Sequence, residues 1–127
     1  MHTYEQDPAQ LQKQLTPAPL VFRNNPDQEP EYAGQPYLVD EFGGIKWIPE
    51  DRRAFADNSW GYGDAPQSLE DFYQRLEGQV RAIVSLAHIS GFCYTQLTDV
   101  EQEQNGIYNY DRTAKFDSQR IAKIFKQ

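Results

Sequence analysis

Two adjacent carboxylates, Asp40 and Glu41, stand where a short apolar run of the sequence ends. The run covers residues 37–39, comes directly after a proline, and is followed within a few residues by a pair of glycines. This pattern is typical of a buried strand, here 37–41, after which the backbone turns sharply. Carboxylates at the end of a buried strand are costly to desolvate and usually have a function there. We therefore expect Glu41 to be a catalytic residue.

Other side chains suited to sugar binding lie after this strand and around a second apolar run at 92–97, which we also interpret as a strand. Aromatic rings stack on the apolar faces of sugars, amides bind sugar hydroxyls, and a pair of acids can cleave a glycosidic bond. The carboxyl ends of parallel strands lie at one edge of a sheet, so we expect these side chains on the same side as Glu41. They are Trp47, Trp60, Tyr62, Tyr94, Thr95, Gln96 and Asp99.

Less specific interpretations of these residues stay open. Glu41 taken alone could be a solvated loop acid, and the acidic stretch 99–103 is typical of a solvated surface. That stretch could also offer oxygen ligands to a cation, but its spacing does not match an EF-hand loop. Cys93 has the pattern of a small hydrophobic residue on a strand, and His88 that of a partner for the dipole at a helix carboxyl end.

Three helices are predicted from capping residues and apolar periodicity. A short helix begins after Asp7, a long helix of about five turns runs from Ser68 to near His88, and a last helix begins after Asp117. The long helix contains Gly78, which costs roughly 1 kcal/mol inside a helix and therefore indicates close packing at that point.

The segments between these elements are expected to be irregular. Residues 16–36 carry five prolines and form a long loop with a brief extended piece at Leu20–Phe22. Such a loop is more often functional or variable than structural. Residues 54–66 form a second, aromatic-rich loop, and the Asn105-Gly106 pair predicts a tight turn.

The predicted order is helix, strand, helix, strand, helix, in a single unit of the α/β class that covers residues 1–127. Strands joined through a long helix run parallel in one sheet with a right-handed crossover. Two parallel strands cannot cover their own faces, and both edges of the pair would be exposed. We therefore expect a slice of a (β/α) barrel or of an open α/β sheet, and not a complete one.

Composition narrows the class of partner. The chain has 127 residues, a formal net charge of -7 and 13% aromatic residues. Nucleic acids and anionic membranes attract clustered Lys and Arg, so the acidic balance argues against both as partners. The aromatic residues suffice for a core and for a binding surface, and an uncharged substrate is compatible with the charge.

Simple counts argue against several classes of site. One cysteine forbids an internal disulfide, and two histidines without a C-x-x-C motif argue against zinc. No apolar run approaches the ~20 residues of a membrane span. The first residues contain neither a basic nor an apolar stretch and do not resemble a signal peptide. The cellular compartment stays open.

Two long stretches resemble glycoside hydrolase family 2, which includes β-galactosidases, β-glucuronidases and β-mannosidases. PYLVDEFGGIKW at 36–47 is similar to the seventh-strand region of its catalytic barrel, and SGFCYTQLTDVEQEQNG at 90–106 to the eighth strand in one branch of the family. WGYG at 60–63 and YDR at 110–112 match that branch, and HTYEQD at 2–7 resembles the segment just after the sixth strand. The similarity covers essentially the whole chain.

The resemblance implies an incomplete (β/α)8 TIM barrel, roughly its last two β/α units, which are strands seven and eight with flanking helices. It gives Glu41 the place of the nucleophile that forms a covalent glycosyl-enzyme intermediate. Tyr94 stands where relatives often carry an aromatic ring near the sugar, and His2 matches a position that often lines the pocket. The substrate would be a carbohydrate of the β-galactoside or β-glucuronide type. No organic cofactor is implied, and we expect no metal site.

The sequence departs from that family at two points. Relatives usually carry Ser before the nucleophile, where this chain has Asp40, and a neighbouring carboxylate can hinder ionisation, although adjacent strand residues tend to point to opposite faces. The family's general acid/base is a Glu that follows an Asn on the fourth strand, and this chain contains no Asn-Glu pair. Retaining chemistry needs two carboxyl groups ~5–5.5 Å apart. Asp99 or Glu103 could lie near enough, but neither matches the family's pattern.

Three functions follow from these observations. The chain could be the carboxyl-terminal part of a retaining glycoside hydrolase that supplies the nucleophile and is inactive alone. It could instead be a non-catalytic carbohydrate-binding or interaction module. It could also associate with a separately encoded amino-terminal barrel segment, or with itself, to complete a barrel, and an exposed apolar sheet edge would favour this third possibility.

Overall fold

The structure is a computed structural model that describes residues 1–17, 21–55 and 58–127. These residues contain three strands, three α-helices and one short 3₁₀ helix, so the chain has the predicted α/β class. In chain order the elements are β1 (His2–Thr3), α1 (Pro8–Leu15), β2 (Tyr37–Gly43), η1 (Glu50–Phe55), α2 (Leu69–Val84), β3 (Ile89–Thr95) and α3 (Ser118–Phe125). None of the described helices has the length and apolar character needed to cross a membrane.

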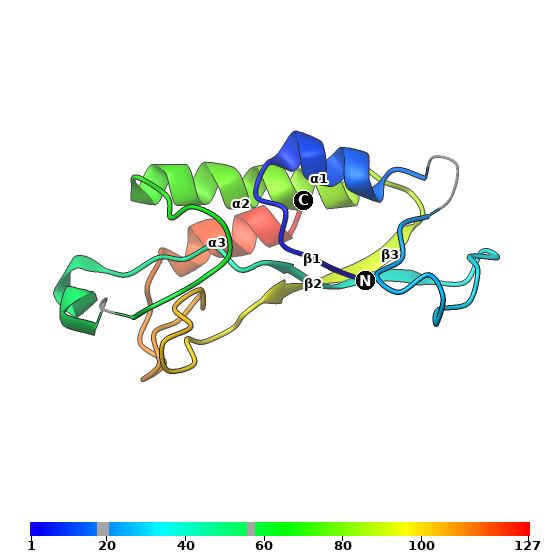
Figure 1. Cartoon of the computed structure of the whole chain (residues 1–127). Coiled ribbons are helices and arrows are strands. Elements are labelled where there is room, and N and C mark those ends of the chain that lie inside the picture. Colours follow the sequence, from blue (N-terminus) through cyan, green and yellow to red (C-terminus); the bar gives the residue numbers. More distant parts are fainter. Residues whose placement is uncertain (18–20, 56–57) are drawn as a thin grey trace.

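The strands form one parallel sheet in the order β1-β2-β3 (Figure 1). The predicted parallel pairing of the two longer strands is confirmed. The sequence did not predict β1, because two residues are too few to show a period. In β1, His2 lies opposite Glu41 and Thr3 lies opposite Phe42. The amino-terminal residues are thereby brought beside the candidate nucleophile.

The boundary between α2 and β3 differs from the prediction. The helix ends at Val84 and not near His88, and the strand runs from Ile89 to Thr95 instead of 92–97. Pairing explains the shift, because Ile89 already lies opposite Tyr37 at the start of β2. Pairing with β2 therefore makes the residues from Ile89 onward part of a strand, although their sequence alone shows no strand pattern.

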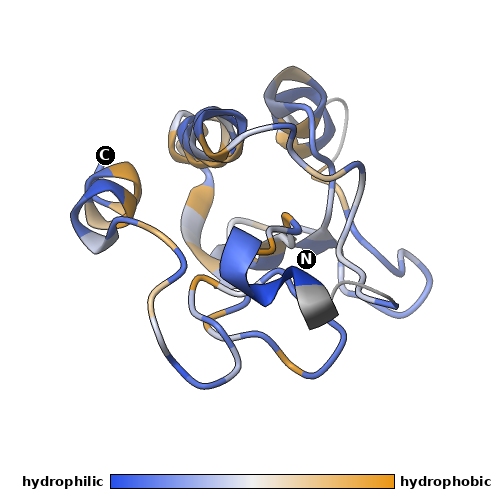
Figure 2. Cartoon of the chain, turned by 90° about the vertical axis from the view of Figure 1, so that its left-hand side faces the viewer, coloured by the Kyte–Doolittle hydropathy of each residue, from blue (hydrophilic) through white to orange (hydrophobic). Residues whose placement is uncertain are grey.

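All three helices lie on one side of the sheet (Figure 1). Contacts join α1 to α2 and α2 to α3, and Figure 2, which looks along the helices, shows them as a single layer around the sheet. One cluster of fully buried apolar side chains fills the space between the helices and the sheet. Its members include Leu11, Leu15, Val39, Phe42, Ile45, Phe72, Leu76, Val80 and Ile83.

Local signals at the helix ends are confirmed. Asp7, Ser68 and Asp117 each accept hydrogen bonds from backbone N–H groups in the first turn of their helix. The close packing predicted at Gly78 is also found, because a Cβ there would lie 2.6 Å from the ring of Pro8 in α1. A glycine at this position therefore lets the two helices approach each other.

The turn predicted at Asn105-Gly106 lies elsewhere. Val100 and Glu103 exchange two backbone hydrogen bonds of 3.1 and 2.9 Å, which close a tight turn where Glu101 has a φ of 51°. Asn105 is fully buried, and a Cβ on Gly106 would come within 2.3 Å of a neighbouring backbone. The glycine thus permits two chain segments to touch and does not form a turn.

The two predicted loops extend partly beyond the described residues. Leu20 lies outside them, and the extended piece expected at Leu20–Phe22 forms no strand at Val21 or Phe22, although Val21 is buried. In the aromatic-rich loop 54–66, residues 56 and 57 also lie outside the described part.

Candidate active site

Asp40 and Glu41 lie in a β-bulge inside β2. The pairing with β3 shifts between Val39 and Phe42, so two residues of β2 stand opposite one residue of β3, Cys93. Val39 and Phe42 are both fully buried in the core, which strict alternation along a strand would not allow. The extra residue leaves both carboxylates outside the core, with 53% of the Asp40 side chain and 39% of the Glu41 side chain exposed.

Residues of and just after β1 hold the Glu41 carboxylate. The hydroxyl of Tyr4 donates a hydrogen bond to Glu41 Oε2 at 2.5 Å, and Nδ1 of His2 lies 3.2 Å from the same oxygen. Neither contact involves Oε1, which therefore stays available to a ligand. The predicted nucleophile is thus oriented through one of its two oxygens.

Tyr4 is a site residue that the sequence reasoning missed. Burial raises the pKa of Tyr4 above its usual value, and the hydrogen bond to Glu41 raises it further. The phenol consequently keeps its proton at neutral pH and can donate it. The tyrosine follows a strand of two residues, and only the pairing of that strand with β2 reveals its proximity to Glu41.

Asp40 shares His2 with Glu41 and also binds the terminal ammonium. His2 Nε2 lies 3.5 Å from Asp40 Oδ2, and the nitrogen of Met1 lies 2.6 Å from Asp40 Oδ1. Partial burial alone would raise the pKa of Asp40, but the hydrogen bonds from the ammonium and the backbone, together with His2, lower it. The bulge thus brings both carboxylates to one histidine, although alternation predicted opposite faces for them.

The two ring nitrogens of His2 face different carboxylates, so the three groups do not converge on one point. In the part of the chain that the structure describes, no group of three His, Cys, Asp or Glu side chains could hold a metal ion.

Aromatic residues from the loop before α2 reach the same place. The ring of Tyr62 is stacked on that of Tyr4, with centroids 3.4 Å apart and an angle of 4° between the planes. Trp60 contacts Tyr62 edge to face at 5.8 Å and is 47% exposed. Gly44 makes this arrangement possible, because a Cβ there would lie 2.4 Å from Tyr62 and 2.9 Å from Tyr4. Of the predicted aromatic residues, Tyr62 therefore contacts the tyrosine that binds Glu41, and Trp60 contacts Tyr62.

Trp47 has a different position. Its side chain is partly buried and packs against the core. Its backbone N–H donates to the carbonyl oxygen of Gln104 at 3.1 Å, and its own carbonyl oxygen accepts from Lys115 at 2.9 Å. Trp60 is consequently the tryptophan with the more open ring face for a sugar.

Tyr94 is turned toward the helices. Its ring centroid lies 5.6 Å from that of Phe42 and 6.1 Å from that of Phe125 in α3, and its hydroxyl donates to the Asn105 carbonyl oxygen at 3.1 Å. Burial raises the pKa of Tyr94. The structure therefore shows Tyr94 in the packing of β3 and not among the contacts of Glu41.

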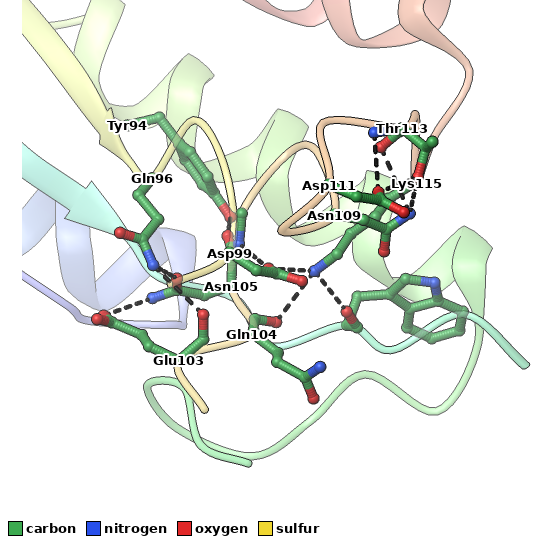
Figure 3. A network of polar contacts seen from close by, with 12 residues as sticks. Tyr94, Gln96, Asp99, Glu103, Gln104, Asn105, Asn109, Asp111, Thr113 and Lys115 are labelled. Carbon is green, nitrogen blue, oxygen red and sulfur yellow. Dashed lines mark hydrogen bonds and ion pairs between the residues drawn. The ribbon is translucent and has the colours of Figure 1, made fainter. Parts of the chain in front are cut away.

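Gln96 begins a chain of side-chain hydrogen bonds beyond β3 (Figure 3). Its Nε2 donates to Asn105 Oδ1 at 2.8 Å, and Asn105 Nδ2 donates to Glu103 Oε1 at 3.1 Å. The backbone of Trp60 is bonded to the same segment, through the Gln102 carbonyl oxygen and the Gln104 N–H. This chain links the loops that follow β2 and β3, and the carbonyl oxygen of the Gln96 side chain is not used in it.

Asp99 is buried in an ion pair with Lys115 (Figure 3). Lys115 Nζ lies 2.5 Å from Asp99 Oδ1 and also donates to the carbonyl oxygens of Trp47 and Gln104, and the Gly106 N–H donates to Asp99. Burial raises the pKa of Asp99 and lowers that of Lys115, and each partner offsets part of the shift in the other. Asp99 thus has a structural environment and does not join the contacts of Glu41.

The surface around Glu41 is open. A hollow of about 740 Å³ beside β1 is lined by His2 and Tyr4, and another of about 240 Å³ is lined by Asp40. Glu41 lines neither of them. A ligand at Glu41 would therefore be only partly enclosed by the described residues.

Comparison with known proteins assigns the chain to no family. No protein-family model matches the chain, and no curated protein matches it.

Proposed function

We propose that this chain is the carboxyl-terminal part of the catalytic barrel of a retaining glycoside hydrolase similar to family 2, and that it supplies the nucleophile Glu41. The observation that carries the proposal is the Glu41 carboxylate in the bulge of β2, held through Oε2 by Tyr4 and His2 and partly exposed beside aromatic rings. The resemblance of 36–47 and 90–106 to that family supports the same assignment.

The fold is compatible with this proposal. Its parallel strands follow one another in sequence order, and its helices lie on one side, as expected for neighbouring units of a (β/α)8 barrel. In this interpretation β2 and β3 are strands seven and eight with their flanking helices, and β1 belongs to the sixth unit. The carboxyl ends of β2 and β3 would then face the substrate.

The proposed reaction uses the free oxygen of Glu41. Oε1 attacks the anomeric carbon while the bond to the leaving-group oxygen breaks, which gives a covalent glycosyl-enzyme that water later hydrolyses. Tyr4 donates to Oε2 and fixes the direction of the attacking oxygen. Trp60 offers a ring to the sugar, and Gln96 an amide oxygen to a hydroxyl group.

The second carboxyl group required by this chemistry is the part that the chain is not expected to supply. Asp99 is buried against Lys115, and Asp40 lies against His2 with a lowered pKa, so neither carboxyl group is suited to protonate a leaving group. We therefore expect the chain to be inactive alone on ordinary glycosides, because retaining chemistry needs a second carboxyl group that can donate a proton to the leaving group.

Charge favours an uncharged sugar over a uronic acid. The site contains the Asp40 and Glu41 carboxylates, and the chain has a formal net charge of -7. In the loops after β2 and β3, Lys46 donates to the Ser59 carbonyl oxygen and Lys115 donates to Asp99. The carboxylate of a uronic acid would lie beside the Asp40 and Glu41 carboxylates without a cationic partner among the lysines just named. A β-galactoside-type substrate therefore fits better than a β-glucuronide.

Covalent labelling tests the proposal directly. A 2-deoxy-2-fluoro-β-galactosyl fluoride needs no acid to expel fluoride, so we expect the isolated chain to form a slow single adduct on Glu41, located by peptide mass spectrometry. The Glu41→Gln variant should form none. An adduct on another residue, or turnover of a chromogenic β-galactoside that survives Glu41→Gln, would contradict the assignment.

A second candidate function is that of a subunit that completes a barrel with another chain or with itself. The observation favouring it is a groove of about 420 Å³ between β3 and α3, lined mostly by apolar side chains. Beside it, β3 pairs only with β2 among the described strands. Size-exclusion chromatography tests this candidate, because a compact monomer at all concentrations would argue against it. A purely sugar-binding module would keep its affinity for galactosides in Glu41→Gln and form no adduct.

A further inference from the structure

We infer that Tyr62 is a positioning residue whose ring holds Tyr4 in the orientation from which the Tyr4 hydroxyl donates to Glu41. The inference rests on the proposed nucleophilic role of Glu41 and adds a residue that does not touch Glu41 itself. A hydrogen bond of 2.5 Å tolerates little rotation of its donor, so the plane of the Tyr4 ring must be fixed by its surroundings.

The stack between the two rings is suited to fix that plane. The centroids are 3.4 Å apart and the planes differ by 4°, so the Tyr62 ring covers one face of the Tyr4 ring. The outer torsion of a tyrosine is broad when the ring is free, and a flat neighbour removes that freedom. Stacking therefore limits the directions in which the Tyr4 hydroxyl can donate its hydrogen bond to Glu41 Oε2.

Tyr62 is itself fixed to β2, the strand that carries Glu41. Its backbone N–H donates to the carbonyl oxygen of Gly44 at 2.9 Å, directly after the strand, and Ile45 forms a bridge with Tyr62. The missing side chain of Gly44 makes room for both rings. The main chain thus sets the Tyr62 ring relative to the carboxylate that Tyr4 must reach.

A second set of backbone bonds holds this loop from the other side. The N–H of Trp60 donates to the Gln102 carbonyl oxygen at 2.8 Å, and the Gln104 N–H donates to the Trp60 carbonyl oxygen at 3.0 Å. The loop that follows β3 therefore supports Tyr62, and through it the Tyr4 contact. Around the Tyr4 hydroxyl, the other groups that bear on it are His2 beside Glu41 and the hydroxyls of Thr95 and of Tyr62 itself.

The test observes the Tyr4 hydroxyl itself, in the isolated chain at pH 7, without any sugar. Tyrosine labelled with ¹³C at Cζ gives a resonance sensitive to the hydrogen bond of the hydroxyl, and Tyr4→Phe identifies the signal. Glu41→Gln provides the shift expected when the charged acceptor is lost. We expect Tyr62→Leu to move the Tyr4 signal toward its Glu41→Gln position, and Tyr62→Phe, which keeps the flat ring and loses only the hydroxyl, to move it less.

Matched controls separate positioning from general damage. Tyr110 is 69% exposed and is replaced by Leu as a control for loss of a surface tyrosine. Circular dichroism checks that each variant is folded, and Tyr62→Met serves in place of Tyr62→Leu if the latter is not. An unmoved Tyr4 signal in a folded Tyr62→Leu or Tyr62→Met protein would overturn the inference, as would an equal shift in Tyr110→Leu. Failure of fluorosugar labelling would contradict the proposed role of Glu41 as nucleophile. The effect of Tyr62 on the Tyr4 signal could still be measured in that case.

Discussion

Two groups of charged side chains in this molecule differ in almost every physical respect. The Glu41 cluster consists of His2, Tyr4, Asp40 and Glu41, and the Lys115 cluster consists of Asp99, Lys115 and the backbone groups that they bind. The side chains of Lys115 and Asp99 are 0% and 3% exposed, whereas 39% to 53% of the His2, Asp40 and Glu41 side chains is exposed.

The difference shows which charges are used for structure. Lys115 donates to Trp47 in the loop after β2 and to Asp99 and Gln104 in the loop after β3, so its charge is compensated by groups that the fold holds in place. Among the described residues, the contacts of Glu41 involve one oxygen only, Oε2. We therefore expect variants of the Lys115 cluster to change stability, and variants of the Glu41 cluster to change labelling.

The largest effect is expected from Lys115→Met. Removing one partner of a buried pair leaves Asp99 uncompensated, which costs about 3–5 kcal/mol in the free energy of unfolding. Urea unfolding followed by circular dichroism measures it, and Arg81→Met in the exposed pair with Glu77 is the matched control, expected to cost less than about 1 kcal/mol. Equal losses in the two variants would contradict the division between structural and functional charges.

Gly106→Ala should give the next largest loss. The added Cβ would lie 2.3 Å from the Asp99 backbone, and the overpacking costs about 1–3 kcal/mol. Gly34→Ala is a useful contrast, because Gly34 has a φ of 93° and no atom near its Cβ position, so that variant reports backbone strain alone. Thermal unfolding compares the two, and a Gly106→Ala protein as stable as wild type would show that the two segments can separate freely.

Tyr4→Phe is expected to separate stability from chemistry. The hydroxyl bond is only partly buried, so its loss should cost about 1 kcal/mol in unfolding free energy. A hydrogen bond to a charged group is worth about 1.5–3 kcal/mol, which corresponds to about a tenfold to hundredfold slower labelling of Glu41 if the bond orients the attack. Pseudo-first-order labelling rates from mass spectrometry measure this, and an unchanged rate would exclude an orienting role for Tyr4.

The smallest effect concerns the acid side of the stability profile. The folded pKa of Asp40 is lowered, so this group stabilises the fold above the ordinary Asp pKa of about 3.9, and its contribution is lost as pH falls through the lower folded value. Because Asp40 is about half exposed, the contribution should stay below about 1 kcal/mol. Unfolding at pH 6 and pH 3 should show a smaller acid-induced loss in Asp40→Asn than in wild type, and an identical loss would contradict the shift.

Local chemistry made the helices predictable. Asp7, Ser68 and Asp117 cap their own first turns, and the apolar stripe of α2 reads directly from its period. The strand that carries Asp40 and Glu41 was also predicted, but its end was placed too early, because β2 continues to Gly43 and the two carboxylates lie inside it. These signals act within a few residues, so one sequence contains them.

What the sequence did not reveal depends on partners far along the chain. The position of Tyr4 beside Glu41 depends on the pairing of β1 with β2, which the sequence does not show. The bulge at Asp40 and Glu41 arises from the register of β2 with β3. The tight turn after β3 was predicted at Asn105-Gly106 but lies at Val100–Glu103. Gly106 is needed where two backbone segments touch and not where the chain reverses. Asp99, which the sequence suggested as a sugar contact, is bound to Lys115, a residue 16 positions away.

The parallel sheet also has a consequence for the order in which the molecule forms. The Tyr4–Glu41 contact joins residues 37 positions apart, and every strand pair encloses a helix or a long loop, so loop-closure entropy must be overcome before any ladder bond is made. The turns of α2 close over four residues and can form early. In pulsed hydrogen exchange during refolding, we therefore expect amides of α2 to gain protection before those of β2, so the contact between Tyr4 and Glu41 forms after α2.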